Sequence, residues 1–311
     1  MDPTSPSLSP MARNKALSLG ARGRAWVDGL PSLVRTVEDA WNLRIGAPLA
    51  GGTAACVASG VTASGEEVVV KLALPDGGFE GQARTLRVAQ GRGYVRLLRY
   101  DSGWQALLLE RLGEPLERLA GPEQQLDVLA ALLQQAWSVP PGPTETFDDK
   151  ARSLYELVDR LWHELGRPCP EPVVARALAG ARQLEGFAVE ECVPAHGDPH
   201  PGNALRVRSP RAGAGTGYVL IDPEGFLAPA AYDLGVVLRE WNEQLLAAVE
   251  PARVARAYCA RLAAATGQDE AAVWEWGYLE RVSTGLYCLA HGAPEAGMPF
   301  LKTAALLVRE G

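Results

Sequence analysis

The 311-residue sequence has few of the features that define disulfide-rich, zinc-binding or membrane proteins. Its five cysteines stand far apart without a C-x-x-C pair, and their odd number argues against a complete disulfide framework. None of the four histidines lies beside a cysteine pair at a spacing that suits structural zinc. No apolar run approaches the ~20 residues that span a bilayer, and the start has no signal-peptide pattern. We therefore expect a cytoplasmic protein with no membrane partner.

Positive charge is scarce relative to negative charge. Lysine and arginine number 30 and aspartate and glutamate 37, which gives a formal net charge of −7 at pH 7. A basic nucleic-acid-binding surface is therefore not expected. Hydrophobic residues make up 47% of the chain and charged residues 22%, which is typical of a folded protein with a sizeable core. The exception is the Pro/Ser-rich start, for which we predict a disordered tail at residues 1–11.

Hydrophobic periodicity divides the chain into a sheet-rich first third and a mainly helical remainder. In the first third, apolar runs separated by turn signals predict strands at 55–62, 67–74, 94–100 and 105–110. Helical periodicity predicts a helix that begins at Pro31 and others at 80–90, 124–137, 150–165, 172–184 and after 230. A hairpin is predicted from 204–207 and 218–222. This order of elements predicts an α+β fold with a small antiparallel sheet followed by a larger helical lobe.

The strongest functional signal is the segment HGDPHPGN at residues 196–203, followed by IDPEG at 221–225. Asn203 lies five residues after Asp198, and Asp222 lies 24 residues after it. Kinase-type phosphoryl transfer uses these groups in this order: an Asp that accepts the hydroxyl proton, then an Asn and an Asp that bind the metal. Mg²⁺ prefers such oxygen ligands. Asp198 by itself also suits a turn, because Gly-Asp-Pro is good turn chemistry, but the register of all three residues favours catalysis.

The pattern H-G-D-x-x-x-x-N followed by I-D-x-x-G resembles that of the aminoglycoside phosphotransferase family, relatives of protein kinases. Segments similar to its streptomycin 6-phosphotransferase and hydroxyurea phosphotransferase branch are GRAWVDGLP (23–31), AAYDL (230–234), LREW (238–241) and ERVSTGLY (280–287). The resemblance covers nearly everything from Gly23 onward. It implies a protein-kinase-like fold with a nucleotide-binding lobe at 12–109, a hinge at 110–114 and a helical lobe at 115–311 that carries the catalytic loop and the substrate pocket.

Carried over to this sequence, the resemblance implies that Asp198 is the catalytic base and that Asn203 and Asp222 are Mg²⁺ ligands. His196 would support the catalytic loop by packing and hydrogen bonding. Asp233 would accept backbone N–H groups of that loop, because an ionised carboxylate is a strong acceptor. An N-cap for the following helix is the alternative role of Asp233 and predicts similar burial.

The resemblance also implies which residues bind ATP. Lys71, on the predicted strand 67–74, would hold the phosphates, whereas an ordinary edge-strand lysine is the alternative. Glu80 on the following helix is the simplest ion-pair partner for Lys71. The turn formed by Gly51, Gly52 and Thr53 would cover the phosphates, since glycines allow close approach of the backbone. Gly-Gly is also common in hairpin turns, so only the position of this turn supports the role.

The hinge and the acceptor pocket carry weaker signals. Backbone groups near Glu110 and Leu112 would hydrogen-bond the purine, and such contacts have no residue-type signature. A cationic aminoglycoside requires carboxylates beside flat or apolar walls. The candidates are Glu224, Glu240, Trp241 and Glu280. For the glutamates a solvated helix face, and for the tryptophan core packing, are the alternatives.

Together these expectations describe an ATP- and Mg²⁺-dependent O-phosphotransferase that modifies a hydroxyl of a streptomycin-like aminoglycoside and so confers resistance. A kinase of the same fold acting on hydroxyurea or another small hydroxylated metabolite is an alternative, because the fold and the catalytic triplet do not choose between acceptors. A nucleotide-binding pseudokinase is the third hypothesis. The Pro/Ser-rich leader and the long loop at 208–217 have no role in any of these readings.

Overall fold

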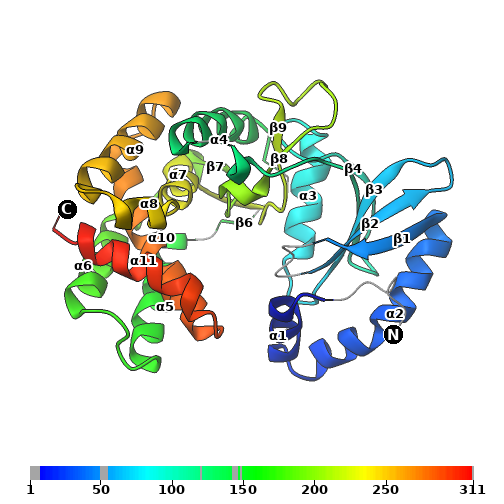
Figure 1. Ribbon diagram of the computed structural model, residues 1–311, viewed down its shortest axis with the longest axis horizontal. Helices are drawn as coiled ribbons and strands as arrows, with labels where there is room; N and C mark the ends of the chain where they lie inside the picture. The colour runs from blue at the N-terminus through cyan, green and yellow to red at the C-terminus, as the bar shows by residue number, and fades with distance from the viewer. Residues whose placement is uncertain (1–7, 50–54, 120, 142–145, 148, 310–311) are drawn as a thin grey trace. The chain divides into compact units, whose positions relative to one another are not determined.

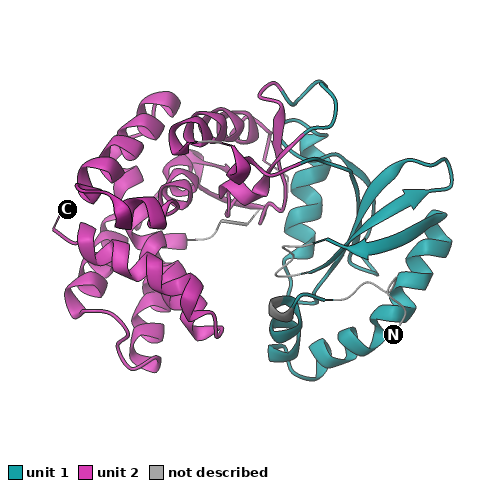
Figure 2. Cartoon of the chain, in the orientation of Figure 1, with its two compact units in different colours: residues 1–113, 207–214 teal, residues 114–206, 215–311 magenta. Residues whose placement is uncertain are grey.

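The computed structural model describes residues 8–49, 55–119, 121–141, 146–147 and 149–309 (Figure 1). The chain forms two compact units (Figure 2). Unit 1 comprises residues 1–113 and 207–214, and unit 2 comprises residues 114–206 and 215–311. Residues 207–214 therefore belong to the N-terminal unit, although the sequence places them in the helical lobe.

Unit 1 is built on a five-stranded antiparallel sheet with the strand order β1-β2-β3-β5-β4. The predicted meander is thus present, and β3 lies in the middle of the sheet. A strand that the sequence reasoning did not predict, β1, forms one edge. The strands are β1 (Leu43–Pro48), β2 (Ala55–Thr62), β3 (Glu67–Ala73), β4 (Leu97–Asp101) and β5 (Ala106–Glu110).

The helix expected to begin at Pro31 begins ten residues earlier. Helix α2 spans Ala21–Trp41 and contains Pro31 in its interior, where a proline removes one backbone hydrogen bond. The helix nevertheless continues because its buried face, which includes Leu30, Val34 and Val37, packs into one core with β1, β2 and β3. Tertiary packing therefore overrides the local signal for a helix start.

The chain is also helical within the predicted tail. Helix α1 spans Pro10–Ser18, so it begins before residue 11, where the tail was expected to end. Its start is stabilised by Ser9, whose Oγ accepts the backbone N–H of Ala12 at 3.1 Å, and by a proline in the first turn. This Ser-Pro pair is therefore a helix-capping signal and not part of a disordered tail.

Helix α3 (Phe79–Ala89) lies beside the sheet of unit 1 and ends at Gln90, which adopts the left-handed conformation of a helix C-cap. Its hydrophobic face includes Phe79, Ala83 and Leu86. The prediction of a helix at 80–90 is therefore confirmed to within one residue at each end.

Unit 2 is mainly helical, which confirms the α+β fold. Its helices are α4 (Pro122–Trp137), α5 (Lys150–Glu164), α6 (Glu171–Gln183), α7 (Ala230–Leu238), α8 (Asn242–Ala247), α9 (Pro251–Thr266), α10 (Glu270–Ala290) and α11 (Pro294–Leu307). Helix α10 packs against α5, α6, α7, α9 and α11. No helix among the described residues is long and apolar enough to cross a membrane.

The crossing of α7 and α10 is unusually close because of Gly235. A Cβ atom at this position would lie 2.3 Å from the Cβ of Trp276, so no larger residue fits without separating the two helices. This contact brings the C-terminal end of α7 next to the middle of α10, and both segments carry charged side chains of the site described below.

Two small sheets in unit 2 flank the HGDPHPGN and IDPEG segments of the sequence. The predicted hairpin is present as β8 (Ala204–Arg206) and β9 (Tyr218–Leu220), while β6 (Thr146–Phe147), β10 (Phe226–Pro229) and β7 (Cys192–Ala195) form a three-stranded sheet. Strand β8 begins directly after Asn203, and β9 ends two residues before Asp222. Short 3₁₀ turns occur at η1 (Leu116–Arg118), η2 (Val189–Glu191) and η3 (Pro201–Asn203).

Candidate active site

The predicted catalytic loop at residues 196–203 follows β7, and a buried carboxylate holds its beginning. Asp233 accepts the backbone N–H groups of His196 and Gly197 and the indole N–H of Trp137, each at 2.9 Å. Burial raises the pKa of Asp233, but three donors require an acceptor and therefore favour its ionised form. Asp233 lies inside α7, whose N-cap is Pro229, so its carboxylate serves the catalytic loop and does not cap its own helix.

The buried imidazole of His196 links the two halves of the motif. Its Nε2 lies 2.7 Å from the carbonyl oxygen of Ile221, which can only accept, so Nε2 carries the hydrogen. The unprotonated Nδ1 then accepts the backbone N–H of Asp198 at 3.1 Å. The neutral imidazole of His196 therefore hydrogen-bonds both segments. It holds Ile221, the residue before Asp222, beside the loop that carries Asp198.

The structure brings the three residues of the predicted triplet together in unit 2. Asn203 donates from Nδ2 to the backbone carbonyl of Asp198 at 2.9 Å, and its own carbonyl accepts the backbone N–H of Ile221 at 2.9 Å. Asp222 has a φ of 59°, which is uncommon for a non-glycine residue and is seen at strained functional positions. The loop and the segment that follows β9 therefore form one hydrogen-bonded unit.

The donor set of this triplet suits a hard divalent cation. Because Nδ2 of Asn203 is engaged by the loop, its Oδ1 is the amide atom that a cation would use. The carboxylate of Asp222 supplies a second oxygen ligand. Within the described ranges, no group of three or more His, Cys, Asp and Glu side chains is placed to hold a metal ion. This pair fits Mg²⁺, which is commonly held by one or two protein oxygens together with substrate phosphates.

A buried arginine that the sequence reasoning missed binds Asp198. Arg239 follows the last residue of α7, its side chain is 12% exposed, and its Nη2 donates to Oδ1 of Asp198. Its Nη1 donates to Oε2 of Glu280 at 2.7 Å, and its Nε donates to Oε1 of Glu240 at 3.4 Å. Three carboxylates therefore converge on one guanidinium.

These contacts determine the charge of Asp198. Burial raises the pKa of its carboxyl, but the attraction of Arg239 and His200 outweighs this effect and holds the pKa below its usual range. The Nε2 of His200 lies 3.7 Å from Oδ2 of Asp198. Burial lowers the pKa of Arg239, whereas Asp198 and Glu280 raise it well above its usual value. Asp198 is therefore an ionised carboxylate with a cation fixed on one oxygen.

The four predicted acceptor-binding residues have different environments. The side chain of Glu280 is only 4% exposed, and that of Glu240 also faces Arg239. Trp241 is buried, donates its indole N–H to Oε1 of Gln125 at 3.0 Å and packs on another aromatic ring, which is the core role open to it from the sequence. Glu224 is 48% exposed and lies 3.3 Å from the ammonium of Lys150. Glu224 thus keeps the most accessible carboxylate of the set.

Lys71 of unit 1 occupies an interior position of the sheet. It lies on the central strand β3, opposite Val57 on β2 and Leu107 on β5, and it is 7% exposed. The alternative of an ordinary edge-strand lysine is therefore wrong. Glu80 lies exposed in the first turn of α3, and its pairing with Lys71 stays a prediction. The predicted phosphate-covering turn of Gly51, Gly52 and Thr53 lies outside the described residues.

The predicted hinge begins at the end of β5. The backbone N–H of Glu110 donates to the carbonyl of Arg96 at 3.1 Å, so this group is already engaged. The side chain of Glu110 is also engaged, because its Oε1 accepts the backbone N–H of Arg96 at 2.8 Å. Leu112 follows the strand and is buried. The backbone at the end of β5 is thus tied to the start of β4.

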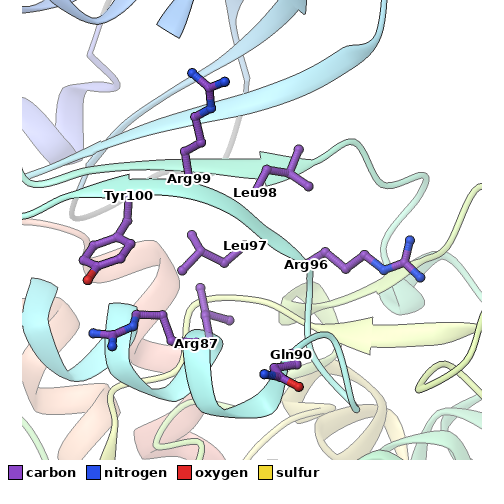
Figure 3. A pocket seen from close by; sticks show the side chains of 8 residues that line it. Arg87, Gln90, Arg96, Leu97, Leu98, Arg99 and Tyr100 are labelled. Atoms are coloured by element: carbon purple, nitrogen blue, oxygen red, sulfur yellow. The ribbon is translucent and has the colours of Figure 1, made fainter. Parts of the chain in front are cut away.

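A separate hollow lies in unit 1 between α3 and β4 (Figure 3). Its floor contains Leu97, and the guanidinium of Arg87 lies 5.0 Å from the centre of the Tyr100 ring at one end. The lining residues are Leu86, Arg87, Gln90, Arg96, Leu97, Leu98, Arg99 and Tyr100. This set includes no carboxylate and none of the predicted site residues, so it is unsuited to a cationic acceptor.

Comparisons with known proteins show which families and folds this chain is similar to. The model of the family described as aminoglycoside/hydroxyurea antibiotic resistance kinase matches residues 40–292. A streptomycin 6-kinase of Streptomyces glaucescens is 29% identical over 288 residues, which cover 91% of each chain. A hydroxyurea phosphotransferase of Kitasatospora aureofaciens is 33% identical over 234 residues, covering 69% of this chain and 62% of that protein. An aminoglycoside phosphotransferase from Streptomyces rimosus, solved with ADP and streptomycin, has a similar fold with a TM-score of 0.56 at 17% identity, covering 83% of this chain and 98% of that one.

Proposed function

Because the chain belongs to the aminoglycoside/hydroxyurea antibiotic resistance kinase family, we propose that it transfers the γ-phosphoryl group of ATP to a hydroxyl of a streptomycin-like aminoglycoside. The phosphotransferase class follows from the family. The observation that carries the proposal is the arrangement around the ionised Asp198. Arg239 orients its carboxylate, and Asn203 donates to its backbone carbonyl. His196 links the loop of Asp198 by a hydrogen bond to Ile221, the residue before Asp222.

Asp198 accepts the proton of the acceptor hydroxyl as the new O–P bond forms and the bond between the β- and γ-phosphates breaks. Its lowered pKa makes it a weak base, so its main contribution is to orient the hydroxyl for in-line attack. This suits a loose transition state, which requires positioning and charge stabilisation more than proton abstraction. Asn203 and Asp222 would hold Mg²⁺, which neutralises negative charge on the phosphates when bound.

Residues of unit 1 have the nucleotide roles in this proposal. Lys71 holds the phosphates, with Glu80 as its proposed partner, and backbone groups near Glu110 and Leu112 bind the purine. The central and buried position of Lys71 supports a specific role, because a lysine is rarely enclosed in a sheet without a function or a partner.

The acceptor is proposed to be cationic. The accessible carboxylate of Glu224 and the acidic net charge suit a substrate with guanidinium or ammonium groups. The match to a streptomycin 6-kinase along nearly the full length of both chains also supports a streptomycin-like acceptor. Inactivation of the antibiotic would be the effect in the cell.

A second candidate function is phosphorylation of hydroxyurea, which the similarity to a hydroxyurea phosphotransferase favours. Hydroxyurea is small and uncharged, so it would not require the carboxylate of Glu224. A Glu224→Gln variant therefore distinguishes the two acceptors. Its KM for streptomycin would rise, whereas its KM for hydroxyurea would stay unchanged.

An ADP-release assay with ATP and Mg²⁺ tests the proposal. The acceptor panel contains streptomycin, other aminoglycosides, hydroxyurea and simple sugars, and Asp198→Ala is the control. We expect turnover on streptomycin that the variant lowers by orders of magnitude. Turnover on another acceptor only would replace the proposed substrate. ATP binding without turnover on any acceptor would favour a pseudokinase.

A further inference from the structure

The loop between β8 and β9 has no role in the function proposed above. Both strands belong to unit 2, yet residues 207–214 of the intervening loop belong to unit 1 (Figure 2). The loop is therefore an inserted part of the nucleotide-binding unit. Its contacts within unit 1 are specific and involve a buried arginine, Arg211.

Arg211 binds the connection between α3 and β4 and the end of β5 at the same time. Its side chain is 7% exposed. Its Nη1 donates to the carbonyl of Gly91 at 2.6 Å, and its Nη2 donates to the carbonyl of Tyr94 at 2.9 Å. Nη2 also forms an ion pair with Oε1 of Glu110, the oxygen that accepts the backbone N–H of Arg96. One guanidinium thus satisfies two backbone carbonyls and the carboxylate at the start of the hinge.

The backbone of the loop fits the same surface closely. The carbonyl of Gly213 accepts the backbone N–H of Gly93 at 2.8 Å. Gly213 has a φ of +79°, and a Cβ atom there would lie 2.6 Å from the carbonyl oxygen of Gly91. Only glycine permits this approach, so the loop is built to dock against residues 91–93.

We propose that Arg211 is a positioning residue for nucleotide binding, because its hydrogen bonds and its ion pair hold the backbone at Glu110 in place. This inference rests on the proposed function, in which backbone groups near Glu110 and Leu112 bind the purine. Hydrogen bonds to a flat base depend on the position of the backbone to within a fraction of an ångström. Without Arg211, the Glu110 carboxylate loses its ion pair and keeps only the backbone N–H of Arg96, and the carbonyls of Gly91 and Tyr94 lose the guanidinium donor, so the end of β5 is held less firmly.

The test compares two arginines of the same loop. Arg208 pairs with Glu67, and both side chains are more than half exposed, so Arg208→Met removes the same charge without touching the hinge. Arg211→Met and Arg211→Lys are made in the full-length chain. We expect Arg211→Met to raise the KM for ATP and the Kd for Mg²⁺-ATP by about tenfold, because part of the binding free energy is then spent on ordering the loosened end of β5. Its kcat and its KM for the acceptor stay within about twofold of the wild type.

The conservative variant and the control complete the experiment. Arg211→Lys should bind ATP more tightly than Arg211→Met but less tightly than the wild type. Its ammonium can keep the ion pair with Glu110 but cannot make the several hydrogen bonds of the planar guanidinium. Arg208→Met leaves both constants unchanged. If Arg211→Met is folded and binds Mg²⁺-ATP like the wild type, the inference is wrong. If Arg211→Met does not fold, the Glu110→Gln variant tests the inference instead. It weakens the same Arg211–Glu110 ion pair, so it must also raise the Kd for Mg²⁺-ATP. A wild type that binds no ATP would overturn the proposed function itself.

Discussion

Replacing Arg239 by methionine tests the electrostatics of the site most directly. In the wild type, Arg239 is the main cation near Asp198 and holds the pKa of that carboxyl below its usual range. In Arg239→Met the opposing effect of burial remains, so the pKa rises. In the proposed function Asp198 acts in its ionised form, so we expect the acidic limb of the kcat profile to move to higher pH in the variant.

The same substitution lowers stability because Glu280 loses its cation. Both side chains are nearly enclosed, at 12% exposure for Arg239 and 4% for Glu280. Removing one partner of a buried ion pair leaves an uncompensated charge and costs about 3–5 kcal/mol of unfolding free energy. Glu280→Gln should cost less, because burial already raises the pKa of Glu280 and Arg239 keeps Asp198 and Glu240 as partners.

The sign of the pH effect on stability follows from the same shift. A carboxyl with a lowered pKa in the folded state stabilises the protein above its unfolded pKa, and this contribution is lost as the pH falls through the folded pKa. For Asp198 the contribution is therefore present at neutral pH and lost in acid. In Arg239→Met this contribution becomes smaller, because the folded pKa of Asp198 rises toward its unfolded value.

The measurements are urea unfolding at several pH values and the pH profile of kcat in the ADP-release assay. The double variant Arg239→Met/Glu280→Gln has no unpaired carboxylate buried at position 280. It should therefore recover part of the stability that Arg239→Met loses, while its pH profile stays shifted as in Arg239→Met. An acidic limb in Arg239→Met that coincides with the wild-type limb would refute the assigned role of Arg239. An unfolding free energy of Arg239→Met equal to that of the wild type would refute the stabilising role of the buried Arg239–Glu280 ion pair.

Three further substitutions test other parts of the site. Asp222→Asn should lower kcat by at least about a hundredfold and raise the Mg²⁺ concentration needed for half-maximal rate. Asp233→Asn replaces one carboxylate oxygen by an amide donor that faces an N–H group, so it should lower the free energy of unfolding in urea by about 2–4 kcal/mol. It should also lower kcat, and an unchanged kcat would contradict the role of Asp233 in holding the predicted catalytic loop. Gly197→Ala places a Cβ 2.8 Å from the side chain of Glu224 at a φ of +93°, so we expect a loss of about 1–3 kcal/mol in thermal unfolding, whereas wild-type stability would show that the loop can shift.

Much of the fold could be predicted from the sequence because its signals are local. Short apolar runs bounded by turn signals indicated β2 and β3, and helical periodicity indicated α3, because each pattern reflects how one element buries its own residues. The fixed spacing of Asp198, Asn203 and Asp222 indicated the chemistry. Spacing is preserved in the chain whatever the packing, so the motif can be recognised before the fold is known.

Tertiary structure decided what depends on partners far away in the sequence. Packing against the sheet carries α2 through Pro31, where local rules predicted a helix start. The close crossing of α7 and α10 brings Arg239 to Glu280, 41 residues away, and encloses a carboxylate expected to meet substrate. Arg211 reaches Glu110 across 101 residues, and no periodicity records such a contact.

The sequence by itself therefore determined the fold class and most of the helices and strands, and it predicted the triplet Asp198, Asn203 and Asp222, because these follow from short-range patterns and from covalent spacing. Only the tertiary structure decided which charged side chains are buried, which carboxylates share a cation and which loop belongs to which unit. Burial and ion pairing depend on which elements pack together, and residues distant in the chain meet only once it has folded.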